Sequence, residues 1–377
     1  MKKTTLILLF SAIIVSQYSR AQCPAGDLII QNQAQVNYFV DQCPDVDTIH
    51  GSLIIGDLNS NINDITGLQF LKVVTGGLTI QHNDSLQSLL GLDSISSIGG
   101  WLNVSQNLKL LSLAHLESIS SINGAISISK NDQLMDLDGL LNVSLFDGDL
   151  IISDNNQLTN IDGLANIQDA SGSVRIHHNA LLPNLNGLIK LKSIQGDLTI
   201  QSNDALKNVD GLDSLETIDN HCSITYNGSL SNLDAFAKLT SIGGDLYIGS
   251  NGSLSDCTGI CGLINNNGIS GSLSVGDNLS NCLNNSVLIP YCQAVPTLSI
   301  ANPEILIFPN PAHQYLRLSD HFNEEIQQLT ISTLAGKIIH SQKLKNKRLD
   351  LTNLSAGMYI LAVHTNHLVY YQKFVVK

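Results

Sequence analysis

A hydrophobic pattern that repeats every 24 residues runs through the middle of the chain. Each repeat carries two apolar residues separated by one residue, usually polar, and such alternation is typical of a short β-strand with one buried face. The first residue of each pair is Leu78, Leu102, Ile126, Leu150, Val174, Leu198, Cys222 or Leu246. An earlier pair starts at Leu53 and a later one at Leu273, so the pattern predicts about ten coils with one strand each.

The rest of each repeat places an apolar residue at every third position, as in Leu86, Leu89, Leu92, Ile95 and Ile98. On an α-helix each step of three residues turns the apolar stripe back by roughly 60°, so five positions would nearly surround the helix. Short extended or 3₁₀-like segments around one core fit better. Gly corners are expected to supply positive φ angles. The corners in question are Asp138-Gly139, Asp162-Gly163, Asn186-Gly187 and Asp210-Gly211.

An unbroken asparagine column follows the strand pair. We expect each side chain to lie inside its turn, where the amide can satisfy backbone groups of its own and the neighbouring coil. The column comprises Asn83, Asn107, Asn131, Asn155, Asn179, Asn203, Asn227 and Asn251, and Asn278 follows in the last coil.

Because no coil can bury its apolar side alone, stacked coils must form the core, which predicts a solenoid. The Leu-x-Ile-x-x-Asn segment resembles the leucine-rich-repeat strand. The period-three remainder and the x-Gly-Leu corner are more similar to the receptor L-domain, over roughly residues 23–292. This resemblance implies a right-handed, single-stranded β-solenoid. The predicted fold is mainly β, with an N-terminal cap at 22–49, the solenoid at 50–292 and a small antiparallel β-sandwich after it.

Solenoid ends require caps. At the N-terminal end, a strand at 26–30 and a helix at 32–42 are predicted, and Asn32 is a suitable N-cap. Cys23 and Cys43 bracket this unit and are disulfide candidates, as are four cysteines near the other end. Those are Cys257, Cys261, Cys282 and Cys292, for which three pairings are open. Cys222 occupies the leucine column and is interpreted as a buried apolar residue rather than a reactive thiol.

The N-terminus has the features of a secretory signal. Lys2 and Lys3 precede a short apolar run, and small residues end at Ala21, so residues 1–21 are predicted to be a signal peptide. A lipid anchor on Cys23 is a weaker alternative, because Gln22 occupies the position where a small residue is needed. Residues 293–302 are the expected linker to the last domain. No segment of the mature chain is expected to span a membrane.

Residues 303–377 differ from the rest in charge and motifs. Short apolar strands are separated by turn signals, which predicts an antiparallel β-sandwich. Four motifs occur in order: 308–311 (FPNP), 334–337 (LAGK), 354–359 (LSAGMY) and 373–377 (KFVVK). Together they resemble the type A sorting domain of type IX secretion substrates. The resemblance implies a partner in the type IX machinery and delivery to the outside or outer-membrane surface of a Gram-negative bacterium. The alternative is an ordinary adhesion-type β-domain.

Charge divides the chain and narrows the function. The whole chain has a net charge of −13, but residues 22–302 hold 8 basic and 27 acidic residues, or −19, whereas residues 303–377 are +3. A step of this size supports a domain boundary. A strongly acidic solenoid excludes nucleic acid, which requires a basic footprint, as the expected partner.

Catalytic motifs are absent from the sequence: there is no G-x-S-x-G elbow, P-loop, H-E-x-x-H or EF-hand loop. A polysaccharide-active β-helix enzyme would need paired carboxylates on one wall. The candidate acids are Asp136, Asp138, Asp147, Asp149, Asp197 and Asp245. Turn geometry already explains most of them, so we expect a non-catalytic protein without a cofactor or metal. Calcium at Asp149, Asp197 or Asp245 stays open on charge alone, and zinc at Cys257 and Cys261 is disfavoured.

Outward strand positions are the better candidates for binding, because most are small and a few are not. The candidate binding residues are Trp101, Asn103, Arg175, His177, His178 and Tyr247. Trp101 is the only tryptophan, and its ring either covers Gly77 and Ala125 in adjacent coils or forms a stacking platform. The predicted function is recognition or adhesion toward an extracellular protein or glycan. The alternatives are a structural surface or matrix component and, more weakly, a polysaccharide-active enzyme.

Overall fold

The structure is a computed structural model. It describes residues 23–294, and in the C-terminal part residues 307–308, 312, 314–318, 326–333, 338–342, 348–365 and 369–377. The predicted signal peptide and all but the first two residues of the predicted linker lie outside these residues. The chain divides into two compact units between Ala294 and Val295, within the 293–302 segment that the charge step had indicated.

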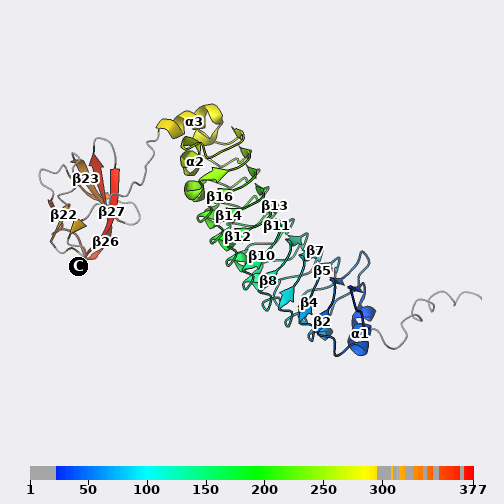
Figure 1. Cartoon of the computed structure of the whole chain (residues 1–377). Helices are drawn as coiled ribbons and strands as arrows, with labels where there is room; N and C mark the ends of the chain where they lie inside the picture. Colours follow the sequence, from blue (N-terminus) through cyan, green and yellow to red (C-terminus); the bar gives the residue numbers. More distant parts are fainter. Residues whose placement is uncertain are drawn as a thin grey trace, which may run out of the picture. The chain divides into compact units, whose positions relative to one another are not determined.

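One parallel sheet of 11 strands runs the length of the first unit and confirms the predicted coils (Figure 1). Successive coils pair in register, as where Leu150 lies opposite Val174 and Ile152 opposite Ile176. The cap contributes β1 as an extra strand. The strands are β1 (Leu28–Ile30), β3 (Leu53–Ile55), β5 (Leu78–Gln81), β7 (Leu102–Ser105), β9 (Ile126–Ser129), β11 (Leu150–Ser153), β13 (Val174–His177), β15 (Leu198–Gln201), β17 (Cys222–Thr225), β19 (Leu246–Gly249) and β20 (Leu273–Gly276).

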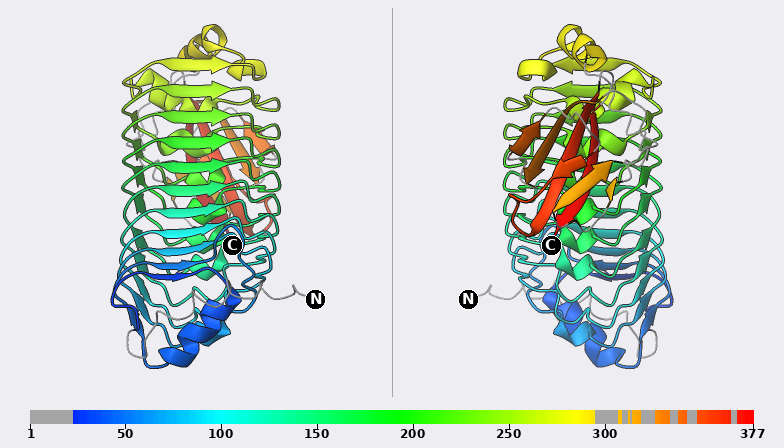
Figure 2. Two further views of the ribbon diagram at one scale, coloured as in Figure 1. Left: turned by 90° about the vertical axis from the view of Figure 1, so that its right-hand side faces the viewer. Right: turned by 90° about the vertical axis from the view of Figure 1, so that its left-hand side faces the viewer.

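The remaining sides of the coils consist of short strands and 3₁₀ turns, as the period-three pattern predicted. There are two smaller parallel sheets on these sides. The first contains β2 (Thr48–Ile49), β4 (Val73–Val74), β6 (Ser97–Ile98), β8 (Ser121–Ile122) and β10 (Leu145–Phe146). The second contains β12 (Asp169–Ala170), β14 (Ser193–Ile194), β16 (Thr217–Ile218) and β18 (Ser241–Ile242). The 3₁₀ turns are η1 (Thr66–Leu68), η2 (Asp138–Leu140), η3 (Asp162–Leu164), η4 (Asn186–Leu188), η5 (Asp210–Leu212), η6 (Asp234–Lys238) and η7 (Thr258–Ile260). Figure 2 shows the coils edge-on, stacked in parallel layers.

All five period-three residues tested above, from Leu86 to Ile98, are buried in a single core that extends through the stack. Burying a leucine or isoleucine contributes about 1.5–3 kcal/mol relative to leaving it exposed. One such side chain at every third position explains why the chain can turn around a core with so little regular helix.

The prediction of positive φ at the Asp-Gly and Asn-Gly corners was wrong. These glycines lie inside 3₁₀ turns, and the reason for glycine is steric. A Cβ on Gly163 would lie 1.8 Å from the carbonyl oxygen of Leu137 in the neighbouring coil, and Gly139, Gly187 and Gly211 face the same obstacle. In these four coils a side chain at the glycine position would clash with the neighbouring coil, whereas the same position is occupied by His115 and by Ala235 in two other coils.

Positive φ instead falls on the residue directly before the asparagine column, and these residues are not glycines. The set is His82, Gln106, Lys130, Asp154, His178, Ser202, Tyr226, Ser250 and Asp277, with φ between 54° and 58°. The left-handed conformation is unfavourable for residues other than glycine, asparagine and aspartate. The hydrogen bonds of the following asparagine hold each of these residues in place.

The asparagine column forms a continuous buried ladder, as predicted. Asn155 Nδ2 donates to the carbonyl of Ile128 at 3.0 Å and to Oδ1 of Asn179 at 3.3 Å, while its own Oδ1 accepts from the backbone N–H and Nδ2 of Asn131. Other rungs repeat this arrangement. At the ends, Ser60 Oγ donates to Asn83 Oδ1, and Asn278 Nδ2 donates to the carbonyl of Cys282.

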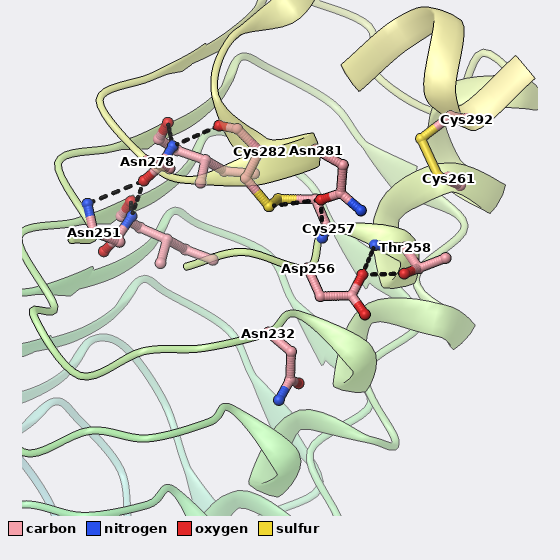
Figure 3. Close-up of a disulfide and its surroundings, with 12 residues drawn as sticks. Asn232, Asn251, Asp256, Cys257, Thr258, Cys261, Asn278, Asn281, Cys282 and Cys292 are labelled. Atoms are coloured by element: carbon pink, nitrogen blue, oxygen red, sulfur yellow. Dashed lines mark hydrogen bonds between the residues drawn. A yellow bond between two sulfur atoms is a disulfide. The ribbon is translucent and has the colours of Figure 1, made fainter. Parts of the chain in front are cut away.

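Both caps are closed by disulfides. The N-terminal cap is α1 (Gln33–Gln42), capped by the Asn32 side chain, and Cys23 is bonded to Cys43 as predicted. At the other end, η8 (Ser280–Cys282), α2 (Cys261–Asn265) and α3 (Asn285–Ala294) cover the last coils. Figure 3 shows how the pairing left open by the sequence is resolved: Cys257 bonds Cys282, and Cys261 bonds Cys292.

Cys222 is a buried free thiol, and burial raises its pKa to about 12. A thiol that resists ionisation is a poor nucleophile. The interpretation of Cys222 as an apolar core residue agrees with this environment.

The second unit consists of two antiparallel sheets. One contains β21 (Ile307–Phe308), β22 (Tyr315–Leu318) and β25 (Arg348–Asp350); the other contains β24 (Ile338–Gln342), β23 (Ile326–Thr333), β26 (Gly357–Thr365) and β27 (Val369–Val376). Leu316 and Leu349 of the first sheet share one core with Leu329, Leu361 and Phe374 of the second, so the unit is a small β-sandwich as predicted.

Two of the four motifs of this unit meet in one strand pair. Tyr359 lies opposite Phe374, and the Tyr359 hydroxyl donates to the carbonyl of Ser355 at 2.8 Å. The C-terminal strand also bridges to Ala312, since Lys377 donates its backbone N–H to the Ala312 carbonyl. The motif residues 309–311 and 334–337 lie outside the described residues.

Candidate functional site

The candidate binding residues all lie in strands of the 11-stranded sheet or directly next to one. We define the strand wall as the outward positions of this sheet together with the residues directly before and after each strand. Trp101 and Asn103 belong to the coil of β7, Arg175, His177 and His178 to that of β13, and Tyr247 to that of β19. Neighbouring groups are three strands apart, about 14 Å at ordinary strand spacing. The structure therefore places them on one surface but in three separate groups.

Trp101 lies over a glycine of the preceding coil. A Cβ on Gly77 would come within 2.4 Å of the indole ring, and the indole N–H donates to Thr79 Oγ1 at 3.1 Å. About half of the side chain, 48%, stays exposed. Cover for Gly77 is thus one role of the ring, and its outer face is free to contact a partner.

Tyr247 has a similar position in its own coil. Its ring reaches along β19 to Gly249, where a Cβ would lie 2.8 Å from the phenolic oxygen. The side chain is 41% exposed. Trp101 and Tyr247 therefore both lie against a glycine, and both side chains stay partly exposed to solvent.

Arg175 is held between two aspartates of the column that precedes the strands. One guanidinium nitrogen lies 2.6 Å from Asp149 Oδ2, and the other lies 3.9 Å from Asp197 Oδ2. Burial alone would raise the pKa of Asp149, but the N–H of Ser173 and the guanidinium of Arg175 hold that pKa below its usual value.

The same aspartates bind the backbone of the next coil. Asp149 accepts from the N–H of Ser173, Asp197 from that of His221, and Asp245 from that of Ser272. Each carboxylate thus has a structural partner, and Arg175 already supplies a positive charge to two of them. This arrangement explains the aspartates without the calcium ion that charge alone had left open.

His177 and His178 form a compact pair at the end of β13. Their Nδ1 atoms are 3.0 Å apart, and the rings meet edge to face with centroids 5.2 Å apart. His178 Nδ1 also lies 3.9 Å from Asp154 Oδ1, in the preceding coil. Burial lowers the pKa of His177, and the carboxylate of Asp154 opposes that shift without reversing it.

Sequence reasoning missed Asp154 as part of this group. Asp154 and His178 both directly precede an asparagine of the column, 24 residues apart, so the repeat alignment places them in adjacent coils at the same position. That alignment was the available signal.

Carboxylates proposed as weaker catalytic candidates also have structural partners. Asp136 accepts from Ser112 Oγ at 2.8 Å and from the N–H of Asp138, and Asp147 accepts from Ser171 Oγ at 2.7 Å. Burial, followed by the charges of Asp136 and Asp162, raises the pKa of Asp138. These contacts account for the acids as parts of the coil corners.

Residues 306–377 match the family described as the secretion system C-terminal sorting domain. The second unit is therefore a sorting domain of type IX secretion, which indicates export and a location outside the cell or on its surface. No curated protein matches the chain. Among the described residues, no helix is long and apolar enough to cross a membrane.

Proposed function

We propose that this protein is a non-catalytic recognition or adhesion protein whose strand wall contacts an extracellular protein or glycan. The observation that supports it is a contrast between the two faces of one sheet. Inward positions repeat the same apolar residues in every coil, whereas the outward positions of three coils carry Trp101, the Arg175–His178 cluster and Tyr247. Exposed aromatic residues and arginine are enriched where proteins recognise partners.

The repeat itself is best interpreted as receptor L-domain-like, with right-handed, single-stranded coils. Its 24-residue period, one long strand per coil and the 3₁₀ turns at most x-Gly-Leu corners support this assignment. Delivery to the outer-membrane surface of a Gram-negative bacterium, after removal of residues 1–21, belongs to the same proposal.

Tryptophan fluorescence tests the wall directly, because Trp101 is the only tryptophan. The full-length chain is titrated with panels of extracellular matrix proteins and glycans, and cells that carry or lack the gene are compared for adhesion. A partner on the wall shifts or quenches the emission, and a Trp101→Ala strain adheres less. Unchanged emission with every ligand, together with unaltered adhesion of that strain, would refute a binding wall.

A structural surface or matrix component is the second candidate. The seating of Trp101 on Gly77 and of Tyr247 on Gly249 favours it, because both rings already serve the fold. Loss of cell-surface integrity in the deletion strain, without loss of adhesion to any partner, would support this candidate. Product release from a polysaccharide panel would instead support the weaker alternative of an enzyme.

Export has a separate test. Deleting residues 303–377 is expected to trap the protein in the periplasm, since the sorting domain is the address that the secretion machinery reads. Normal surface display of the truncated chain would contradict this role.

A further inference from the structure

We propose that Asp154, His177 and His178 form a binding site for a divalent transition-metal ion, with Zn²⁺ as the probe that tests it. The site goes beyond the recognition function proposed above and does not depend on it. Its three donors come from two adjacent coils, and their ligand atoms lie within 4.8 Å of one another.

Distances between the donors fit a single ion. Zinc binds imidazole nitrogen and carboxylate oxygen at about 2.0–2.2 Å. The two Nδ1 atoms, 3.0 Å apart, can therefore both ligate one ion with a nitrogen–metal–nitrogen angle of about 95°. Asp154 Oδ1, 3.9 Å from His178 Nδ1, can then complete three protein ligands after a small movement of its side chain. Three ligands leave coordination positions open to solvent.

Backbone geometry fixes two of the donors before any ion arrives. Asp154 and His178 both have left-handed backbones, with φ of 56° and 57°. The Asp154 N–H donates to the His177 carbonyl at 3.1 Å, and the His178 N–H donates to the Gln201 carbonyl at 3.0 Å. The sheet therefore holds the two coils in the register that brings the three side chains together.

Charge around the pair is suited to a cation. Arg175 is the nearest arginine on the strand, but Asp149 and Asp197 flank its guanidinium, and the Asp154 carboxylate adds a negative charge at the site. A histidine must be neutral to bind a metal. Imidazole and carboxylate together suit zinc, copper and nickel rather than calcium or magnesium.

The repeat offers substitutions that other coils already accept. His177→Gln and His178→Ser reproduce Gln201 and Ser202 of the next coil, and Asp154→Ser reproduces the serine found at Ser202 and Ser250. His82→Ser is the matched control, because His82 occupies the same left-handed column as His178 but belongs to no such cluster among the described residues.

Calorimetric titration of the untagged full-length chain with Zn²⁺ is the experiment, with the unfolding temperature measured on the same samples. We expect one Zn²⁺ per chain, affinity reduced more than about tenfold by Asp154→Ser, and loss of binding in the His177→Gln/His178→Ser variant. Zinc should raise the unfolding temperature of the wild type and of His82→Ser but not that of the double variant.

Two results would overturn the site. One is zinc binding of equal stoichiometry and affinity in the wild type and the double variant, which would place the ion elsewhere. The other is a wild-type chain that gives no heat of binding on titration with Zn²⁺ and whose unfolding temperature does not change with Zn²⁺. Unfolding temperatures without zinc confirm that each variant is folded, so a misfolded variant cannot be mistaken for loss of ligands.

Discussion

The two faces of the long sheet obey different rules. On the inner face, each coil repeats an apolar pair, and the buried asparagine follows in every coil from Asn83 to Asn278. On the strand wall, neighbouring coils carry unlike residues at one position, such as Arg175, Thr199 and Ser223 across β13, β15 and β17. The sequence is uniform at positions where each residue contacts its counterpart in the next coil. It varies from coil to coil at positions that face solvent.

This contrast explains where function can reside in a solenoid. An inward change disturbs its own coil and both neighbours, because strands, glycines and asparagines are stacked in register. An outward change disturbs fewer contacts between coils, such as those of Trp101 with Gly77 and Thr79. Specific chemistry is therefore expected on the wall, and the difference between the faces can be tested by paired substitutions.

The largest expected effect comes from the close-packed corner. Gly163→Ala places a Cβ 1.8 Å from the Leu137 carbonyl oxygen, whereas nothing lies within 4 Å of a Cβ on Gly228. We expect Gly163→Ala to lower the free energy of unfolding by more than about 4 kcal/mol and Gly228→Ala to change it by less than about 1 kcal/mol. Urea unfolding followed by circular dichroism measures both. Similar values for the two variants would show that the corner is not close-packed.

The second-largest effect on stability is expected in the asparagine ladder. Asn155→Ala leaves the Ile128 carbonyl and the Asn131 N–H buried without their partners, whereas Asn156 is exposed and bonds only through its side chain to Asp132. We expect a loss of about 3–5 kcal/mol for Asn155→Ala, since each unsatisfied buried group costs about 1–3 kcal/mol. Asn156→Ala should cost less than about 0.5 kcal/mol. Equal losses in urea unfolding would contradict a structural role for the column.

A smaller effect is expected at the wall itself. Trp101→Ala removes the cover of Gly77 and the hydrogen bond to Thr79, which should lower the free energy of unfolding by about 1–2 kcal/mol. Tyr226→Ser, which reproduces Ser202 of the preceding coil in the same left-handed column, should cost less than about 0.5 kcal/mol. A loss for Trp101→Ala as large as that for Asn155→Ala would show that the wall is as constrained as the interior.

The smallest effect concerns pH. Burial, followed by the charge of Asp213, raises the pKa of Asp210 above its usual value. The folded state therefore binds more protons than the unfolded state between the two pKa values, and stability falls as pH rises through that window. Asp210→Asn, as in Asn186 of the preceding coil, should remove this fall and slightly raise stability at neutral pH. Unfolding midpoints of both chains at about pH 3 and pH 7 measure it, and a larger fall in the variant would contradict the sign.

Interior features were predictable because they repeat. The strand pairs, the asparagine ladder, the caps and Cys222 all follow from periodicity and burial, since every coil meets the same constraint. The role of glycines such as Gly163 was misread, because close approach between coils leaves no mark in a single repeat. Asp154 was missed for a related reason: the site joins two coils, and each half looks like an ordinary turn.

One measurement tests most directly whether the inner face of the sheet supports the fold while the strand wall carries the function. The wall residues of three coils are replaced with residues that other coils carry at the same positions, as Trp101→Ser, Asn103→Ser, His177→Gln and Tyr247→Ser in one chain. Adhesion of cells that display this chain is compared with that of wild-type cells at equal surface amounts. We predict that the variant chain is displayed and folded but that adhesion falls to the level of the deletion strain. Wild-type adhesion by the variant would contradict the assignment of function to the strand wall.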